Sequence, residues 1–241
     1  MTRRSKTASV PYPDTDRHRD PLPPVPPSPS SPYMTYEQFL DAVDEDSRAE
    51  WVDGVIEFMS SPVSLPHQNI ITFLTEILSV YVRVHALGKV TTAPFQMKLP
   101  RSGREPDVIF VAQDHLGRFE QNFLHGPADL VVEVVLPESV RRDRQIKLAE
   151  YQEGGVPEYW LIDPRPRRKR ATFYQLDDAG RYQVTPPDSA GVYRSRAVPG
   201  FWLRVAWLWQ QPQPDPTRVL LEIDRDAYAA YFQQQLRDAG L

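Results

Sequence analysis

Apolar residues recur at helical spacing over one long stretch of the chain. From Pro66 to about Leu87 they fall three or four positions apart, at Ile70, Phe73, Leu74, Ile77, Tyr81 and Val84. Pro66 suits the first turn of a helix and Gly88 suits its end, so the spacing predicts a long helix packed on the core. A short helix is predicted after Thr35, because Thr35 and Gln38 have the spacing of a capping box.

Shorter apolar runs predict strands. Residues 50–59 form two such runs around Asp53-Gly54, a dipeptide typical of tight hairpins. Further strands are expected at 90–99, 107–112, 130–136, 158–162, 171–176, 181–185 and 202–205. The run 130–136 is almost entirely apolar, so both of its faces should be buried. A helix expected at 142–153 joins this run to the strand at 158–162 as a β-α-β unit.

These elements predict one domain of the α/β (α+β) class, with a mixed central sheet flanked by helices. Residues 1–33 carry many prolines among serines and charges and cannot bury a core, so we expect a disordered arm there. The domain should span 34–210. Residues 211–241 should form a C-terminal extension with an amphipathic helix at 226–237.

Composition narrows the classes of site. The chain has no cysteine, which excludes disulfides, thiolate metal sites and cysteine nucleophiles and fits a reducing cytoplasm. No apolar run reaches the roughly 18 residues that a membrane span needs, so we expect a cytoplasmic protein without membrane contact. The net charge of −4 gives no general attraction to nucleic acid. Any such binding must therefore come from local basic patches or bound metal.

Two carboxylates stand in or beside strongly apolar strands. Glu133 lies within the run 130–136, where an ionised acid must be paired, hydrogen-bonded, neutralised or bound to metal. A structural salt bridge or an edge-facing side chain is the alternative. Asp107 follows Pro106 at the start of the next apolar strand, and alone it could be just a polar strand start. Two carboxylates on adjacent strands, however, can share a hard divalent cation.

Two further charged residues are candidates for the same site. Lys147 lies on the helix after the Glu133 strand, on one stripe with Asp143 and Tyr151. It can lean over the end of the sheet, although the pattern alone favours a surface pair with Asp143. Glu50, on the hairpin, is either a third carboxylate of the site or merely the residue that begins its strand.

Two basic clusters could contact backbone phosphates, with solvated turns as the alternative. They are Arg141, Arg142 and Arg144, and then Arg165, Arg167, Arg168, Lys169 and Arg170 after Asp163-Pro164. We expect His67 to cap the long helix or lie on the surface rather than approach a site. The tryptophans at 202, 207 and 209 are interpreted as core or interface residues, not as platforms for base stacking.

An ordered set of segments resembles the Uma2 family over residues 35–209. The segments are 50–54, His67, Glu105-Pro106-Asp107-Val108, 129–135, 147–151 and 155–164, the last containing Gly155-Val156-Pro157-Glu158-Tyr159-Trp160. The resemblance implies a restriction-endonuclease-like fold of the PD-(D/E)xK type. It implies Asp107 and Glu133 as metal ligands and Glu50 as the N-terminal acid of the site. Leu136 stands where the family typically has a serine.

The resemblance also implies a displaced lysine, because Val135 occupies the usual place on the strand and Lys147 comes from the following helix. Asp107, Glu133 and the carbonyl of Val134 would hold Mg²⁺, with Mn²⁺ as an alternative. Lys147 would assist the attack of water on a DNA phosphodiester bond. Glu50 would complete this catalytic group of four.

Nucleases often pair subunits to cut both strands, so we expect a homodimer. Two other hypotheses stay open. One is a nucleic-acid-binding or regulatory module whose site turns over slowly or not at all. The other is a structural or interaction protein in which Glu133 and Lys147 form a buried ion pair.

Overall fold

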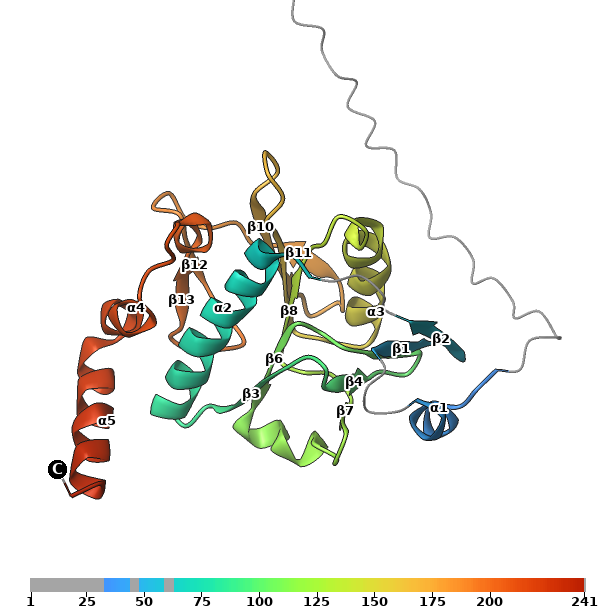
Figure 1. Cartoon of the computed structure of the whole chain (residues 1–241), viewed down its shortest axis with the longest axis horizontal. Coiled ribbons are helices and arrows are strands. Elements are labelled where there is room, and N and C mark those ends of the chain that lie inside the picture. The colour runs from blue at the N-terminus through green and yellow to red at the C-terminus, as the bar shows by residue number, and fades with distance from the viewer. Residues whose placement is uncertain (1–32, 44–47, 59–62, 241) are drawn as a thin grey trace, which may run out of the picture. The chain divides into compact units, whose positions relative to one another are not determined.

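A six-stranded mixed sheet forms the centre of the computed structural model, which describes residues 33–43, 48–58 and 63–240 (Figure 1). The arm expected at 1–33 lies outside these residues except for its last position. The strand order is β11-β10-β9-β8-β6-β3. The bounds are β3 Gly88–Thr92, β6 Val108–Ala112, β8 Leu130–Val134, β9 Glu158–Asp163, β10 Arg170–Leu176 and β11 Tyr182–Val184. β8 and β9 are parallel, and the other neighbours are antiparallel.

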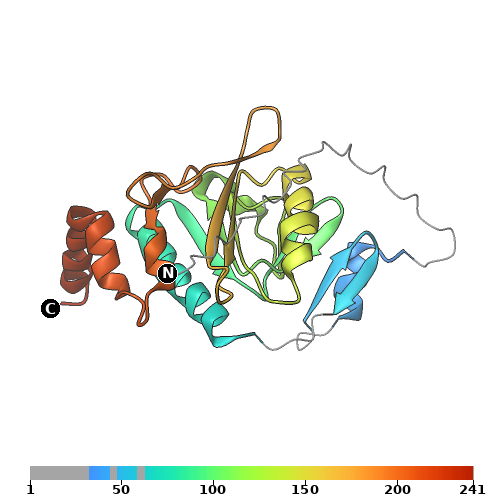
Figure 2. The same cartoon turned by 90° about the horizontal axis from the view of Figure 1, so that it is seen from above.

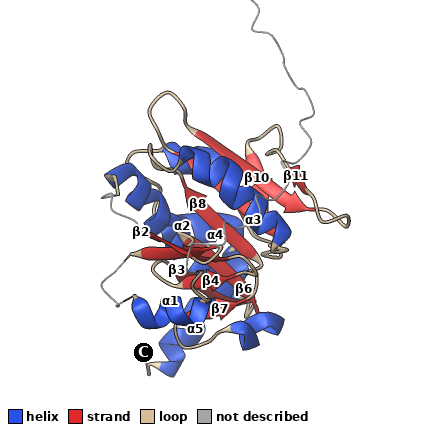
Figure 3. Cartoon of the chain, turned by 90° about the vertical axis from the view of Figure 1, so that its right-hand side faces the viewer, coloured by secondary structure: helices blue, strands red, loops and turns tan. Residues whose placement is uncertain are grey.

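Helices cover both faces of this sheet (Figures 1 and 2). On one side α2 (Leu65–Val84) packs on Val132 and Val134 of β8, and on the other α3 (Lys147–Glu153) packs on Val131. Because side chains alternate along a strand, β8 is buried on both faces, as its apolar run predicts. Figure 3 shows the sheet from the side of α3.

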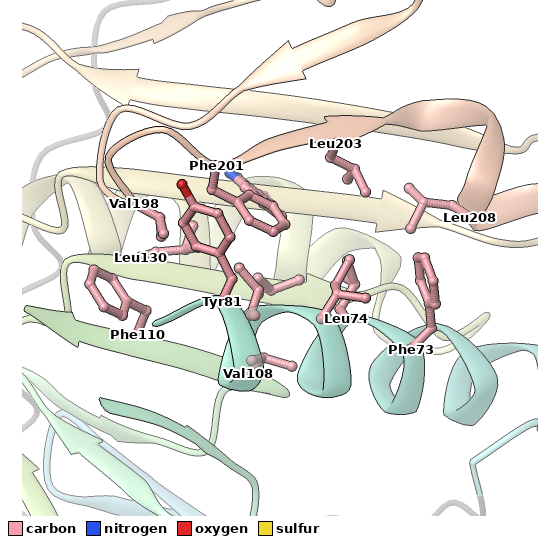
Figure 4. Close-up of a cluster of buried hydrophobic side chains, with 14 of the residues drawn as sticks. Phe73, Leu74, Tyr81, Val108, Phe110, Leu130, Val198, Phe201, Leu203 and Leu208 are labelled. Carbon is pink, nitrogen blue, oxygen red and sulfur yellow. The ribbon is translucent and has the colours of Figure 1, made fainter. Parts of the chain in front are cut away.

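The core between α2 and the C-terminal part is the largest of the apolar clusters. Figure 4 shows Phe73, Leu74 and Tyr81 of α2 directed toward Phe201, Leu203 and Leu208, which follow the central sheet in sequence. The short strands β12 (Val192–Arg194) and β13 (Trp202–Arg204) form a hairpin there. Trp207 is buried in this cluster, with Trp202 and Trp209 packed against it, so their interpretation as core residues is confirmed.

A second sheet of five strands carries the N-terminal hairpin. Its order is β2-β1-β5-β4-β7, with bounds β1 Ala49–Val52, β2 Val55–Phe58, β4 Gln96–Lys98, β5 Ser102–Arg104 and β7 Phe123–His125. The Asp53-Gly54 turn has positive φ at both residues, 48° and 85°, as the predicted hairpin requires. Helix α1 (Tyr36–Ala42) begins with the predicted capping box of Thr35 and Gln38 and packs beside β1.

Several element predictions were wrong in detail. The strand expected at 90–99 is two strands in different sheets, β3 and β4, because Pro94 between them has no N–H for a ladder. The helix expected at 142–153 begins with a π-helical turn, Arg142–Ile146, before α3. The strands β5, β7 and β12 have three residues each and were missed, as were the 3₁₀ helices Gln113–Arg118 and Val205–Trp209.

The C-terminal segment ends in two helices, α4 (Pro216–Ile223) and α5 (Arg225–Asp238). The helix predicted at 226–237 is present as α5, but no residue of α5 is buried. Val219 and Leu220 of the unpredicted α4 join the core beside α2 instead. The boundary at residue 210 stays a prediction. None of the helices in the described part of the chain has the length and apolar character to cross a membrane.

A buried carboxylate ties β9 to the segment before β13. Glu158 is fully buried and accepts hydrogen bonds from Trp160 Nε1 at 2.5 Å, the Tyr193 hydroxyl at 2.8 Å and Ser195 Oγ at 3.0 Å. Two backbone N–H groups, of Arg196 and Ala197, donate to its other oxygen at 2.7 and 2.8 Å. A buried acid is tolerated when donors satisfy it in this way. Glu158 therefore has a structural role.

Replacing Glu158 by alanine should lower the free energy of unfolding by at least about 3 kcal/mol, because buried donors lose their shared acceptor. Urea denaturation at neutral pH measures the effect. The exposed Glu120→Ala is the matched control and should leave the midpoint almost unchanged. Equal midpoints for the two variants would contradict the structural role of Glu158.

Candidate active site

A narrow pocket of about 40 Å³ opens at the carboxyl end of β8. The four residues proposed from the sequence all line it: Glu50 on β1, Asp107 just before β6, Glu133 on β8 and Lys147 at the start of α3. The β1 hairpin belongs to the five-stranded sheet and β8 to the six-stranded sheet. The pocket thus lies where the two sheets and α3 meet.

Lys147 is buried between two carboxylates. Its side chain is 4% exposed, and Nζ donates to Glu133 Oε1 at 2.8 Å and lies 3.2 Å from Glu50 Oε1. Burial opposes the charge of Lys147, but Glu133 and Glu50 outweigh it and hold its pKa above the ordinary value. The ammonium is therefore charged and fixed. The surface pair of Lys147 with Asp143, which the sequence pattern alone favoured, is wrong, since Asp143 is buried too.

Asp107 faces both β8 and α2. Its Oδ2 accepts the N–H of Val134 at 2.7 Å, which fixes this carboxylate against β8. His67 Nε2 lies 3.5 Å from the same oxygen, and His67 is 3% exposed. The interpretation of His67 as a cap or surface residue is therefore wrong: Ser64 caps α2, and the imidazole turns inward to the pocket.

Arg104 was missed by the sequence reasoning, although it organises one wall of the site. Its side chain is fully buried on β5 and donates to Glu50 at 2.7 Å and to Glu57 at 3.0 Å. It also forms a two-pronged pair with Glu150 of α3, at 2.7 and 2.8 Å. The signal that could have found it is the number of acids in the segments 50–57 and 147–151, which need a buried cation between them.

Glu50 is held by this arrangement on both oxygens. Oε2 accepts from Arg104, and Oε1 accepts from the N–H of Glu105 at 3.1 Å and faces Lys147. Burial disfavours the charge of Glu50, yet Lys147 and Arg104 lower its pKa to about 2. Glu50 is thus an ionised anchor between two buried cations.

The remaining acids of the pocket repel one another. Burial raises the pKa of Glu133 above its ordinary value, Lys147 opposes this, and Asp107 and Asp143 add to it. Burial, reinforced by Glu50, raises the pKa of Glu105 to about 7. The Tyr151 hydroxyl donates to Glu133 Oε1 at 2.6 Å. The acids of the lining outnumber its cations Arg48, Arg142 and Lys147, so an additional cation would be stabilised here.

The oxygen donors fit a hard divalent cation that keeps water ligands. Asp107 and Glu133 offer two carboxylates, and Mg²⁺ typically binds through one or two such groups while the rest of its shell stays water. Across residues 33–43, 48–58 and 63–240, no three His, Asp or Glu side chains are grouped so as to hold a metal by themselves. An ion held by Asp107 and Glu133 would complete its shell with water.

The predicted basic clusters divide into engaged and exposed residues. Arg142 lines the pocket, Arg141 is exposed, and Arg144 pairs with Asp163 at 2.9 Å. The basic turn, defined as Arg167, Arg168 and Lys169, is exposed between β9 and β10. Val134 pairs with Ile162 in the parallel β8–β9 ladder, so this turn follows the same sheet end as the pocket.

Comparison with known proteins gives a family and a fold. The profile of the Uma2 family, described as "Putative restriction endonuclease", matches residues 35–206. A solved structure from Anabaena variabilis ATCC 29413, titled as "a putative nuclease belonging to DUF820", is similar with a TM-score of 0.61 and 16% identity. The similarity covers 73% of this chain and 97% of that one. A search of curated proteins finds no match. The predicted restriction-endonuclease-like α/β fold is confirmed.

Replacing Arg104 by methionine should lower the free energy of unfolding by about 3–5 kcal/mol, because it leaves Glu50 and Glu150 buried without their cation. Urea denaturation measures this. Arg101→Met is the matched control: Arg101 also makes a two-pronged pair, with Asp53, but its side chain is 54% exposed. That change should cost less than about 1 kcal/mol. A tolerated Arg104→Met would show that the network does not stabilise the fold.

Proposed function

The chain belongs to the Uma2 family, and from this premise we propose that it is a divalent-metal-dependent endonuclease that hydrolyses phosphodiester bonds in DNA. The observation that carries the proposal is the convergence of Asp107, Glu133 and Lys147 in one pocket at a sheet end. These residues come from three separate elements. Two carboxylates and a fixed ammonium that line one pocket are the groups that metal-assisted phosphodiester hydrolysis uses.

In this proposal Asp107, Glu133 and the carbonyl oxygen of Val134 hold the cation, Mg²⁺ or alternatively Mn²⁺. A bound ion of this kind supplies a water of lowered pKa and neutralises charge on the phosphate. The N–H of Val134 donates to the Asp107 carboxylate, and the Tyr151 hydroxyl donates to Glu133. Both ligands are therefore oriented before any substrate arrives.

Lys147 places a positive charge beside the scissile phosphate and stabilises the negative charge that develops during attack. Glu50 is assigned to holding Lys147 rather than to binding metal, because its oxygens are engaged by Arg104, Glu105 and the lysine itself. This assignment keeps Glu50 in the catalytic group as a positioning residue.

Recognition of DNA rests on phosphate contacts in this proposal. The basic turn and Arg141 are exposed, and the basic turn follows the sheet end that carries the pocket. Cations at such positions fix the register of a nucleic acid without reading its bases. A homodimer would place two such sites against the two strands of a duplex.

Supercoiled plasmid incubated with Mg²⁺ should be nicked by the wild-type protein. Asp107→Asn and Lys147→Met should each slow nicking by about 100-fold or more, since they remove a ligand and the fixed charge. The exposed Asp114→Asn is the matched control for the aspartate and should cut at the wild-type rate. Melting curves of each variant establish that it is folded.

Metal binding separates this proposal from a purely structural ion pair of Glu133 and Lys147. Calorimetric titration with Mn²⁺ should give saturable binding that Asp107→Asn and Glu133→Gln abolish. Absence of binding by the wild-type protein would favour the structural hypothesis. Saturable binding without any nicking would favour the regulatory one.

Removing the basic turn by Arg167→Ala, Arg168→Ala and Lys169→Ala together should weaken DNA binding about tenfold and reduce its salt dependence by two to three phosphates, roughly one for each lost contact. Fluorescence anisotropy with a duplex at several salt concentrations measures both. The charge-matched control is Arg218→Ala, Arg225→Ala and Arg237→Ala on α4 and α5. An equal loss in both triple variants would show that only net charge matters.

A further inference from the structure

A second and larger pocket, here called the side pocket, opens directly beside the candidate active site. Its volume is about 290 Å³, against about 40 Å³ for the active-site pocket. The two pockets share four lining residues: Arg48, Val63, His67 and Asp107. None of the roles assigned above uses the side pocket. Its position would place an occupant next to whatever binds at Asp107.

Among the residues that the structure describes, no charged residue lines the far part of the side pocket. Beyond the shared residues it is lined by Gln68 and Ile71 of α2 and by the segment Thr92-Ala93-Pro94 after β3. The lining there combines the apolar side chains of Ile71, Ala93 and Pro94 with one amide and one hydroxyl. Such a wall suits an occupant with apolar faces and a hydrogen-bonding edge, and it offers nothing to a second phosphate.

A nucleobase has this character, and one nucleoside fits a cavity of this size whereas a base pair does not. Pockets for small molecules begin at roughly 300 Å³. Side-chain amides and hydroxyls are the groups that bond base edges, and unpaired bases are commonly held in protein pockets in this way. Because Asp107 lines both pockets, a strand whose phosphate lies at the metal ligands would place its adjoining base in the side pocket.

The groove continues past this position. A third pocket of about 370 Å³ shares Thr92 and Pro94 with the side pocket and adds Phe95, Gln96 and Asn122. It gives the strand a course along the end of β3, with the Phe95 ring and the Asn122 amide for the next nucleotide. Glu105 lines this third pocket as well as the active-site pocket.

We propose that the side pocket receives one unpaired base of the substrate strand, next to the scissile phosphate, and that Arg48 contacts the phosphate at the junction of the two pockets. The inference rests on the proposed function and adds a substrate class to it: DNA that is single-stranded or locally unpaired. Extracting a base from a duplex costs energy that a single strand does not require. The protein therefore binds a single strand more tightly than the same sequence in a perfect duplex.

The test uses a 12-nucleotide single strand with Ca²⁺ in place of Mg²⁺, so that binding is measured without hydrolysis. One base at a time is replaced by an abasic sugar, and in a second series by the fluorescent base 2-aminopurine. One position should stand out: there the abasic change weakens binding about tenfold and 2-aminopurine fluorescence changes on binding. The perfect duplex should bind about tenfold more weakly than the single strand.

Gln68→Trp fills the side pocket from an exposed position on α2, and Asn69→Trp is its neighbour on the same helix turn but outside the pocket. The Gln68→Trp protein should lose about tenfold in affinity for the intact strand and show no further loss with the abasic strand. The Asn69→Trp protein should behave as wild type in both respects. Arg48→Ala should weaken binding of intact and abasic strands by the same factor.

A flat abasic series, or one equally pronounced in the Gln68→Trp protein, would overturn the side pocket as a base site. Plasmid nicking with Mg²⁺ alongside a flat series would overturn this inference alone and leave the proposed function standing. A position-dependent series without nicking supports the base site while removing the proposed hydrolysis. Failure of every oligonucleotide to bind would overturn both.

Discussion

The site depends on a network of buried ion pairs, in which each charged side chain is stabilised by an opposite charge next to it. Lys147 is charged because Glu133 and Glu50 face it, and Glu50 is charged because Arg104 and Lys147 face it. Arg104 in turn is bound to Glu150 on the helix that carries Lys147. These ion pairs connect β1, β5, β8 and α3, so they also hold the two sheets together. Removing one link leaves an uncompensated charge out of water, which costs far more than an exposed pair.

From the sequence it could be predicted that certain buried charged side chains need partners, but not which residues those partners are. An acid within the apolar β8 needed hydrogen-bond donors, and Glu133 accepts hydrogen bonds from Lys147 and Tyr151. Periodicity places Lys147 on a helix stripe but says nothing of depth, so it suggested a surface pair. Arg104 sits on a strand of three residues whose pattern is too short to read. Burial of these cations follows from tertiary packing, which local pattern does not contain.

The segment that makes the family resemblance most specific, Glu158-Tyr159-Trp160, does not line the pocket. Glu158 collects the donors that fasten β9 to the segment before β13, and Trp160 is one of them. A family signature can therefore record how the sheet is assembled rather than how the reaction is performed. His67 shows the reverse case, since it looked incidental in the sequence yet faces Asp107. In this fold, how specific a segment is for the family does not indicate how close it lies to the candidate active site.

Because the lysine of the site comes from α3, the strand position that would otherwise carry it is free to pack in the core. Val135, at the position that a strand-borne lysine would take, is 1% exposed and packs in the core against the α3 side. Glu133 lies on the central sheet, whereas the Lys147 ammonium lies on a helix that begins after the π-helical turn Arg142–Ile146. The distance between Glu133 and the Lys147 ammonium is thus set by how the short helix α3 packs on the sheet. A shift of α3 would therefore change the distance between the Lys147 ammonium and Glu133 without moving β8.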